Sequence, residues 1–394
     1  MSFPEQSRAA YRQVVALTGA LFLSYLTVAM SLPAVPVHVV QHLGLPNAAG
    51  GLAIGIAFLS TILTRGIAGG LSDRIGGKLC MQRGLLIYAV ACVICLTSSW
   101  GTLPNLTAYT VLIAGRLLVG LGESLAMVGM ISWAIGLMGQ PQTGRVMALV
   151  GAGMYGSFAV GGPLGMILLG RTGFAGVMAA CTLLPLIGLL AIQAIPAVAP
   201  SPGRRESFWR IIGQIWQPGT VVGFQGVGFA VLGAFFSLYF LSRGWPYAGL
   251  GLTCFGLGFV AVRLLCGHLP DRIGGTPVAL VSLGVEACGQ FLLWQAYTPL
   301  MALAGALLTG LGCSMVFPAM GANVVKRVPP HLRGTAIGGF VIFQDLAYGA
   351  SGPLVGLLAD KTSYSTVFLV GGVAALLAMT LTLRLHRAVL IAPA

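Results

Sequence analysis

The stretch Arg65–Gly77, RGIAGGLSDRIGG, recurs at Arg263–Gly275 as RLLCGHLPDRIGG, almost position for position. Each copy starts in an apolar run and continues into a short polar turn. Two further landmarks recur in the same order: Gly120-Leu-Gly122 with Gly310-Leu-Gly312, and Gly162-Pro-Leu-Gly165 with Gly352-Pro-Leu-Val-Gly356. Three matched landmarks in one order indicate two related halves that follow the same plan in the same direction.

The composition predicts an all-α membrane protein. Of the 394 residues, 57% are hydrophobic and only 7% are charged, with a mean hydropathy of +0.93, whereas a soluble domain carries about a quarter of its residues as charged side chains. Apolar runs long enough to cross a bilayer, about 20 residues each, recur along the chain. We expect twelve transmembrane helices in two parallel-repeat six-helix bundles, near residues 14–40, 48–71, 80–99, 107–136, 146–169, 174–195, 219–241, 248–268, 277–296, 300–325, 335–358 and 364–386.

The formal net charge of +13 is distributed unevenly over the predicted loops. The loops on one side hold only Arg171, Arg243 and Lys361, and nearly all other basic residues fall on the opposite side. Cytoplasmic loops carry such an excess of Lys and Arg, so both termini are expected in the cytoplasm. The basic charge therefore reflects topology, and no nucleic-acid partner is expected.

Residues 196–218 interrupt the apolar pattern with prolines, charges and an amphipathic run. We expect a bundle over 1–195, a cytoplasmic linker over 196–218 whose second part lies along the membrane surface, and a bundle over 219–394.

The cysteines, including the pair Cys92 and Cys95, fall in or beside apolar spans and are expected to be packing residues. His38 and His42 have helical metal spacing but lack nearby acids, which favours a surface position. We expect no metal and no cofactor.

The landmarks resemble the major facilitator superfamily over essentially the whole chain, which implies its fold. The turn after the second helix is similar to the family signature, carried here by Gly69, Leu71, Asp73, Arg74, Gly76 and Lys78. The family usually has a second basic residue where Gly77 stands, and the second copy, with Asp271 and Arg272, has Thr276 in place of the trailing base. Five short stretches carry a closer resemblance: residues 24–27 (SYLT), 120–124 (GLGES), 317–319 (FPA), 343–345 (FQD) and 351–354 (SGPL). In these the chain resembles bacterial YfcJ/YhhS-type permeases, which are regarded as exporters.

Two further motifs bear on coupling. Arg116-x-x-x-Gly120-x-Gly122 in the fourth helix resembles the arginine motif of proton-coupled members, and the Gly/Pro-rich stretch Gly151–Gly165 resembles the motif of export-type antiporters. The pattern Gly151-x-Gly153-x-x-Gly156 also matches a dinucleotide fingerprint, but it lies inside an apolar span and favours close helix packing.

Six ionisable side chains lie within the predicted spans, and a charge in hydrocarbon costs at least about 2.5 kcal/mol. They are Arg65, Arg116, Glu123, Arg263, Glu286 and Asp345. Glu123 is two helical turns after Arg116, roughly 10 Å along the axis. Glu123 is either the main proton carrier, with Arg116 tuning it or holding an anionic group, or one member of a fixed structural pair.

The other acids receive different expectations. Asp345 is the third residue expected to take part in proton coupling, beside Glu123 and Arg116. Its repeat partner is Tyr155, and the resemblance places its helix beside Arg65. We therefore expect a lock between the halves that opens during transport, in preference to direct substrate contact. Glu286 is expected to have a structural role, either neutralising Arg263 or capping a neighbouring polar group. The resemblance implies that Asp73 and Asp271 pair with basic residues and a helix N-terminus to hold one gate state.

Substrate contacts are expected from the first, fourth, seventh and tenth helices, although ordinary packing could explain any one side chain. The candidates are Tyr25, Thr27, Gln225, Phe229, Phe235, Tyr239, Phe317 and Asn323. Aromatic rings with sparse polar groups suit an amphiphilic organic solute.

We therefore expect a monomeric proton-coupled secondary transporter in the bacterial inner membrane, exporting small organic compounds by alternating access. The alternative is proton-linked uptake of a sugar or organic acid. A membrane-embedded enzyme would need clustered catalytic groups, and a sensor would need a sizeable soluble output domain. The sequence indicates neither, so we do not expect an enzyme.

Overall fold

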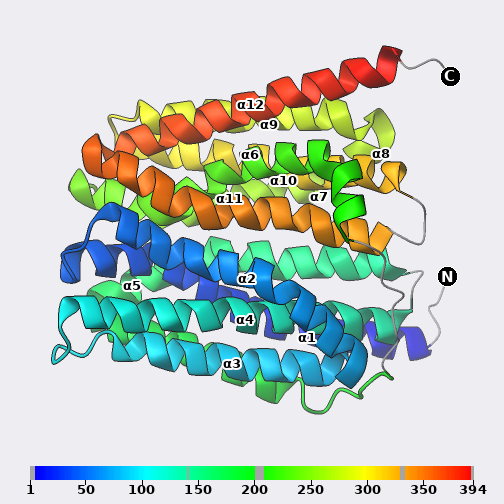
Figure 1. Ribbon diagram of the computed structural model, residues 1–394, viewed down its shortest axis with the longest axis horizontal. Helices are drawn as coiled ribbons and strands as arrows, with labels where there is room; N and C mark the ends of the chain where they lie inside the picture. The colour runs from blue at the N-terminus through cyan, green and yellow to red at the C-terminus, as the bar shows by residue number, and fades with distance from the viewer. Residues whose placement is uncertain (1–4, 140–141, 200–207, 329–332, 392–394) are drawn as a thin grey trace. The chain divides into compact units, whose positions relative to one another are not determined.

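The computed structural model describes residues 5–139, 142–199, 208–328 and 333–391, and every regular element in these ranges is helical (Figure 1). The elements are α1 (Glu5–Val37), η1 (His38–His42), α2 (Asn47–Ile75), α3 (Gly77–Thr97), α4 (Asn105–Met138), α5 (Thr143–Ala191), α6 (Phe208–Ser242), α7 (Leu250–Cys266), α8 (Leu269–Ile273), α9 (Gly275–Trp294), α10 (Pro299–Arg327), α11 (Arg333–Lys361) and α12 (Tyr364–Ile391).

Ten helices of the described ranges are long and apolar enough to cross a membrane, and α7 is a shorter apolar helix. α5 is itself two helices joined at Gly173, whose φ of 68° and ψ of −173° are not helical. Its two parts correspond to the expected spans 146–169 and 174–195. The outer faces are apolar as well, since Leu264 is 79% exposed and Leu63 is 78% exposed. The all-α membrane fold is thus confirmed.

The chain divides into two compact units. Unit 1 comprises Met1–Gly44 and Ile56–Arg204, and unit 2 comprises Leu45–Gly55 and Arg205–Ala394, so the first part of α2 belongs to unit 2. Residues 200–207 of the expected linker lie outside the described residues. Its second part, from Phe208, is the first portion of α6, where Ile215 is fully buried.

The duplication is visible in the backbone. Gly76 precedes α3 with φ 85° and ψ 157°, and Gly274 precedes α9 with φ 91° and ψ 151°. These conformations suit glycine because side chains disfavour positive φ. The glycine that follows each one packs against the next long helix: Gly77 against Gly129 of α4, and Gly275 against Ala319 of α10.

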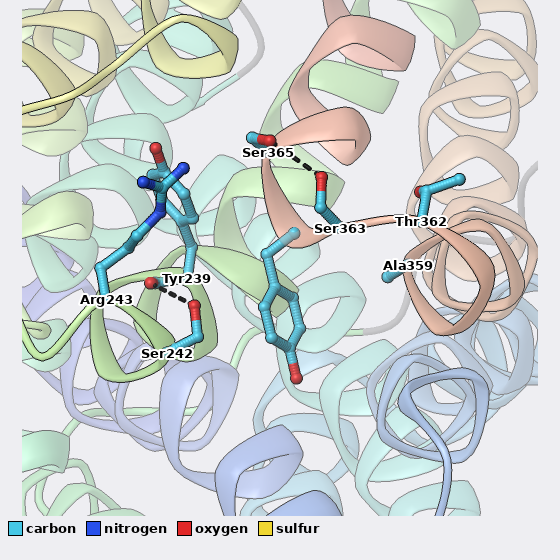
Figure 2. A pocket seen from close by; sticks show the side chains of 8 residues that line it. Tyr239, Ser242, Arg243, Ala359, Thr362, Ser363 and Ser365 are labelled. Atoms are coloured by element: carbon cyan, nitrogen blue, oxygen red, sulfur yellow. Dashed lines mark hydrogen bonds between the residues drawn. The ribbon is translucent and has the colours of Figure 1, made fainter.

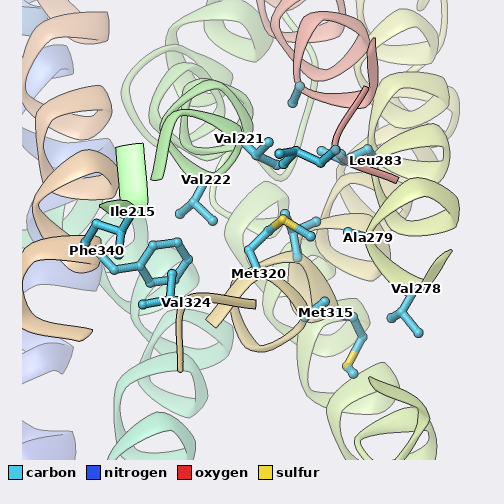
Figure 3. Packing of buried hydrophobic residues seen from close by; sticks show 14 of the residues in the cluster. Ile215, Val221, Val222, Val278, Ala279, Leu283, Met315, Met320, Val324 and Phe340 are labelled. Atoms are coloured by element: carbon cyan, nitrogen blue, oxygen red, sulfur yellow. The ribbon is translucent and has the colours of Figure 1, made fainter. Parts of the chain in front are cut away.

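Buried side chains from α6, α9, α10, α11 and α12 form a hydrophobic core cluster in unit 2 (Figure 3). Val221, Leu283, Met320 and Phe340 are among its members. Lipid is as apolar as these side chains, so the helices are held by close packing and small residues more than by removal from water. This packing fixes the rotation of α6, α9 and α10 and therefore the direction of their polar groups.

His38 differs from its expected surface position. It lies in the π-helical turn η1, just after Pro33 and Pro36 of α1, and is buried with its ring stacked 3.9 Å from that of Phe174. Prolines remove helical hydrogen bonds and favour such irregular turns. His42 remains exposed, as expected.

Candidate functional site

A polar cluster inside unit 1 centres on Glu123 of α4, which is only 6% exposed. The hydroxyl of Tyr25 on α1 donates a hydrogen bond to Glu123 Oε1 at 2.9 Å. The same hydroxyl lies 3.3 Å from the sulfur of Met127, one turn further along α4. A carboxylate that accepts such a bond is stabilised in its charged form.

Arg116 and Tyr88 complete this cluster. Arg116 is buried, and its Nη1 donates to Ser31 Oγ at 3.2 Å. Tyr88 of α3 is fully buried and lies within electrostatic reach of both Glu123 and Arg116. Arg65 also lies close enough to Tyr25 to interact with it electrostatically. The structure thus gathers three of the predicted charged residues in unit 1 around two tyrosines.

Glycines allow the helices of this cluster to approach closely. A Cβ added at Gly122 would lie 2.9 Å from the backbone nitrogen of Tyr88, and Gly84 packs against Ala126. Small residues are enriched where membrane helices meet for this reason. Of the two motif glycines, Gly122 therefore brings α4 against α3 beside Glu123, whereas Gly120 packs against Ala57 of α2.

Two acids of unit 2 are also buried, Glu286 on α9 and Asp345 on α11. Asp345 lies in unit 2 and Arg65 in unit 1, so their expected lock stays a prediction. Glu286 is fully buried, and the side chains that act on it are Cys313 and Gln225. Among the described residues its carboxyl oxygens have no hydrogen-bond partner, and the expected contact with Arg263 is not found there.

Arg263 occupies a different position from the one expected. Its guanidinium lies 5.2 Å from the ring centre of Phe259, one turn earlier on α7. Matching acids to arginines in the sequence could not reveal this position of Arg263, because the number of charges does not fix the rotation of each helix.

Lys78, the last residue of the signature that follows α2, binds backbone carbonyls just after the end of α5. Lys78 Nζ donates to the carbonyl oxygens of Gln193 at 2.8 Å and Ile195 at 2.6 Å, and it lies 5.6 Å from the ring centre of Trp133. Trp133 in turn donates to the carbonyl of Pro196 at 2.8 Å. A cation at a helix C-terminus is favourable because the last carbonyls lack partners.

The remaining gate residues flank the two turns. Gly69 and Asp73 are partly buried in the last turns of α2, and Arg74 is exposed. Arg272 is exposed in α8, and the side chain of Asp271 lies outside the described residues. Their role in gating stays a prediction.

Most of the cavity candidates make packing contacts within their own unit. Thr27 Oγ1 donates to the carbonyl of Cys181, Tyr239 to that of Ala296, and Asn323 Nδ2 to Thr276 Oγ1. The rings of Phe229 and Phe317 lie 5.1 Å and 4.9 Å from Phe255 and Phe340, and Phe235 is fully buried. Their role toward a substrate stays a prediction.

Tyr88 and Ser31 are cluster members that the sequence reasoning missed. The repeat offered one signal: counting on from Gly76 and Gly274, Tyr88 of α3 is equivalent to the acidic Glu286 of α9. Ser31 carried no signal, because its contact with Arg116 joins helices far apart in the chain.

A cavity of about 230 Å³ lies at one end of unit 2 (Figure 2). It is lined by Tyr239, Ser242, Arg243, Ala359, Thr362, Ser363, Tyr364 and Ser365. Ser363 and Ser365 share a hydrogen bond of 2.9 Å, and Ser242 donates to the carbonyl of Tyr239. Arg243 lies over the ring of Tyr239. Other lining groups bond outside the cavity, since Thr362 donates to the carbonyl of Leu358 and Tyr364 to Asn47 Oδ1.

Comparison with known proteins agrees with this architecture. The sequence profile of the Major Facilitator Superfamily matches residues 17–251 and 221–391. An uncharacterized MFS-type transporter of Salmonella typhimurium is 42% identical over 361 residues, covering 92% of this chain and 93% of the relative.

Solved structures share the fold at low sequence identity. A mutant of the nucleoside transporter NupG superimposes with a TM-score of 0.77 at 13% identity, covering 94% of this chain and 99% of its own. The D-xylose-proton symporter gives a TM-score of 0.77 at 17% identity, covering 94% and 96%. The chain is therefore a multi-pass membrane transporter that belongs to the major facilitator superfamily.

Proposed function

We propose that this protein is a proton-coupled secondary transporter that exports small organic compounds across the bacterial inner membrane by alternating access, with both termini in the cytoplasm. The observation that carries the proposal is the buried carboxyl group of Glu123, held by the hydroxyl of Tyr25 at 2.9 Å. An ionisable group at membrane depth is costly, and such groups mark pathways for ions or protons.

The cluster supplies the two states that coupling needs. When Glu123 is charged, Tyr25 stabilises it by donating a hydrogen bond, and Arg116 lies two turns away on the same helix. When Glu123 binds a proton, the charge disappears and the hold on Tyr25 weakens. Binding or release of a proton at Glu123 therefore alters the contact between α1 and α4.

Export is supported by the Gly/Pro-rich Gly151–Gly165, which resembles the motif of antiporters. The second candidate is proton-linked uptake of a sugar or an organic acid. The guanidinium of Arg116, bonded to the hydroxyl of Ser31, favours this alternative because it could hold a carboxylate. A structural neighbour is by its name a proton symporter for D-xylose.

The test is transport in liposomes with an imposed pH gradient, using a panel of fluorescent amphiphilic amines and of organic acids. The wild-type protein should move at least one probe in a gradient-dependent manner, and Glu123→Gln should abolish this dependence. Cys288→Ser, on an exposed face of α9, is the control and should retain it. Unchanged gradient dependence in Glu123→Gln would sink the proposal, and the direction of probe movement decides between export and uptake.

A further inference from the structure

Glu286 of α9 is a buried acid that the proposed mechanism does not use. Its side chain has 0% exposure, and neither carboxyl oxygen has a hydrogen-bond partner in the described part of unit 2. An unsatisfied buried polar group is costly, and a buried charge without a partner is far more costly. The protonation state of this group therefore requires an explanation.

Among the residues that the structure describes, none supplies a positive charge to Glu286. α6 contributes the amide of Gln225 and the backbone of Gly228, where an added Cβ would lie 2.5 Å from Glu286 Oε1. α10 contributes the thiol of Cys313, the titratable group beside the carboxyl, and Gly312 packed on the Glu286 backbone.

The remaining faces around Glu286 are equally uncharged. One turn along α9, Gln290 donates to the carbonyl of Gly228 and to Thr309. The oxygen of Gln290 faces Gly371 of α12. The helices around Glu286 thus present amides, a thiol and glycines.

The internal repeat explains why the counter-charge is missing. Tyr88 is the counterpart of Glu286, and Gly122 packs on Tyr88 as Gly312 packs on Glu286. Counting from Gly120 and Gly310, Glu123 corresponds to Cys313, and Arg116 corresponds to the buried Ala306. Each unit therefore has one carboxyl group where two equivalent helices cross. In unit 1 the acid is on α4, the second helix of the pair, and in unit 2 it is on α9, the first. Only unit 1 has an arginine at this crossing, because Ala306 stands at the position of Arg116.

We propose that Glu286 is a second proton-binding site, separate from Glu123, and that its carboxyl group carries a proton in the conformation described here. A carboxylic acid satisfies this site because it has no net charge and can donate its proton to a neighbouring acceptor. The side chain of Gln225 lies beside the carboxyl group, and its oxygen, which has no hydrogen-bond partner among the described residues, supplies an acceptor group. The bound proton neutralises the carboxyl group of Glu286, for which unit 2 has no counterpart of Arg116.

Infrared spectroscopy of the purified protein in lipid, in H₂O and in D₂O, tests the proposal without a substrate. At neutral pH the wild type should show the C=O band of a protonated carboxyl group shielded from water, and Glu286→Gln should remove that band completely. Glu123→Gln should retain it, so the test does not depend on proton coupling at Glu123. A spectrum of Glu286→Gln that still contains the band would overturn the proposal.

Thermal unfolding gives a second, independent readout. Glutamine is neutral and nearly isosteric with a protonated glutamate, so Glu286→Gln should unfold at the wild-type temperature or above it. Arg263→Gln should leave the infrared band unchanged, because Arg263 lies over Phe259. A Glu286→Gln protein that does not fold or melts well below wild type would instead indicate an ionised glutamate and refute the protonated site. So would a carboxylic-acid band that is absent from the wild type and appears in Arg263→Gln, because removing a counter-charge favours the protonated acid.

Discussion

At the scale of single residues, the contact between Tyr25 and Glu123 is the most direct test of the coupling cluster. Tyr25→Phe keeps the ring and removes the hydroxyl that donates to Glu123 Oε1 at 2.9 Å. A hydrogen bond to a charged group contributes about 1.5–3 kcal/mol. Its loss disfavours the carboxylate, so Glu123 should bind its proton at higher pH.

The measurement is the pH profile of gradient-driven transport in liposomes. In Tyr25→Phe the pH of half-maximal transport should rise, and the rate at neutral pH should fall about tenfold, which corresponds to about 1.4 kcal/mol. Met127→Leu is the matched control, since it alters the other neighbour of the hydroxyl without touching the carboxyl group. An identical profile in Tyr25→Phe would show that this bond does not tune proton binding.

At the scale of elements, the start of α2 is capped by an acid from α11 within unit 2. Asp360 accepts hydrogen bonds from the Asn47 backbone at 2.8 Å, the Asn47 side chain at 2.8 Å and the Ala48 backbone at 3.1 Å. Tyr364 donates to Asn47 Oδ1 at 2.7 Å. A carboxylate at a helix N-terminus satisfies free N–H groups and complements the helix dipole.

Asp360→Ala removes the carboxylate that accepts these hydrogen bonds and should weaken the cap by about 1 kcal/mol. The expected result is a melting temperature lower than that of the wild type, measured by thermal unfolding in detergent. Lys361→Ala changes the adjacent exposed residue and should melt at the wild-type temperature. If the two variants melt alike, the capping contact contributes nothing measurable.

The elements also show what the sequence could predict. The spans and the turns at Gly76 and Gly274 followed from apolar length and from glycines that need positive φ. The burial of Glu123 followed from its place in an apolar helix. The partners of Lys78 and Glu286 could not be predicted, because they depend on helix rotation and on where α5 ends.

At the scale of the whole molecule, the distribution of Lys and Arg predicts the orientation in the membrane. Two exposed positions that are expected on different sides of the membrane test this orientation. Arg74 lies at the end of α2, and Tyr297 lies between α9 and α10. In a background without native cysteines, Tyr297→Cys should react with a membrane-impermeant maleimide in intact cells. Arg74→Cys should react only after the membrane is permeabilised, because basic loops stay in the cytoplasm. The reverse labelling pattern would contradict the orientation and the cytoplasmic termini together, since each added span changes the side of the chain.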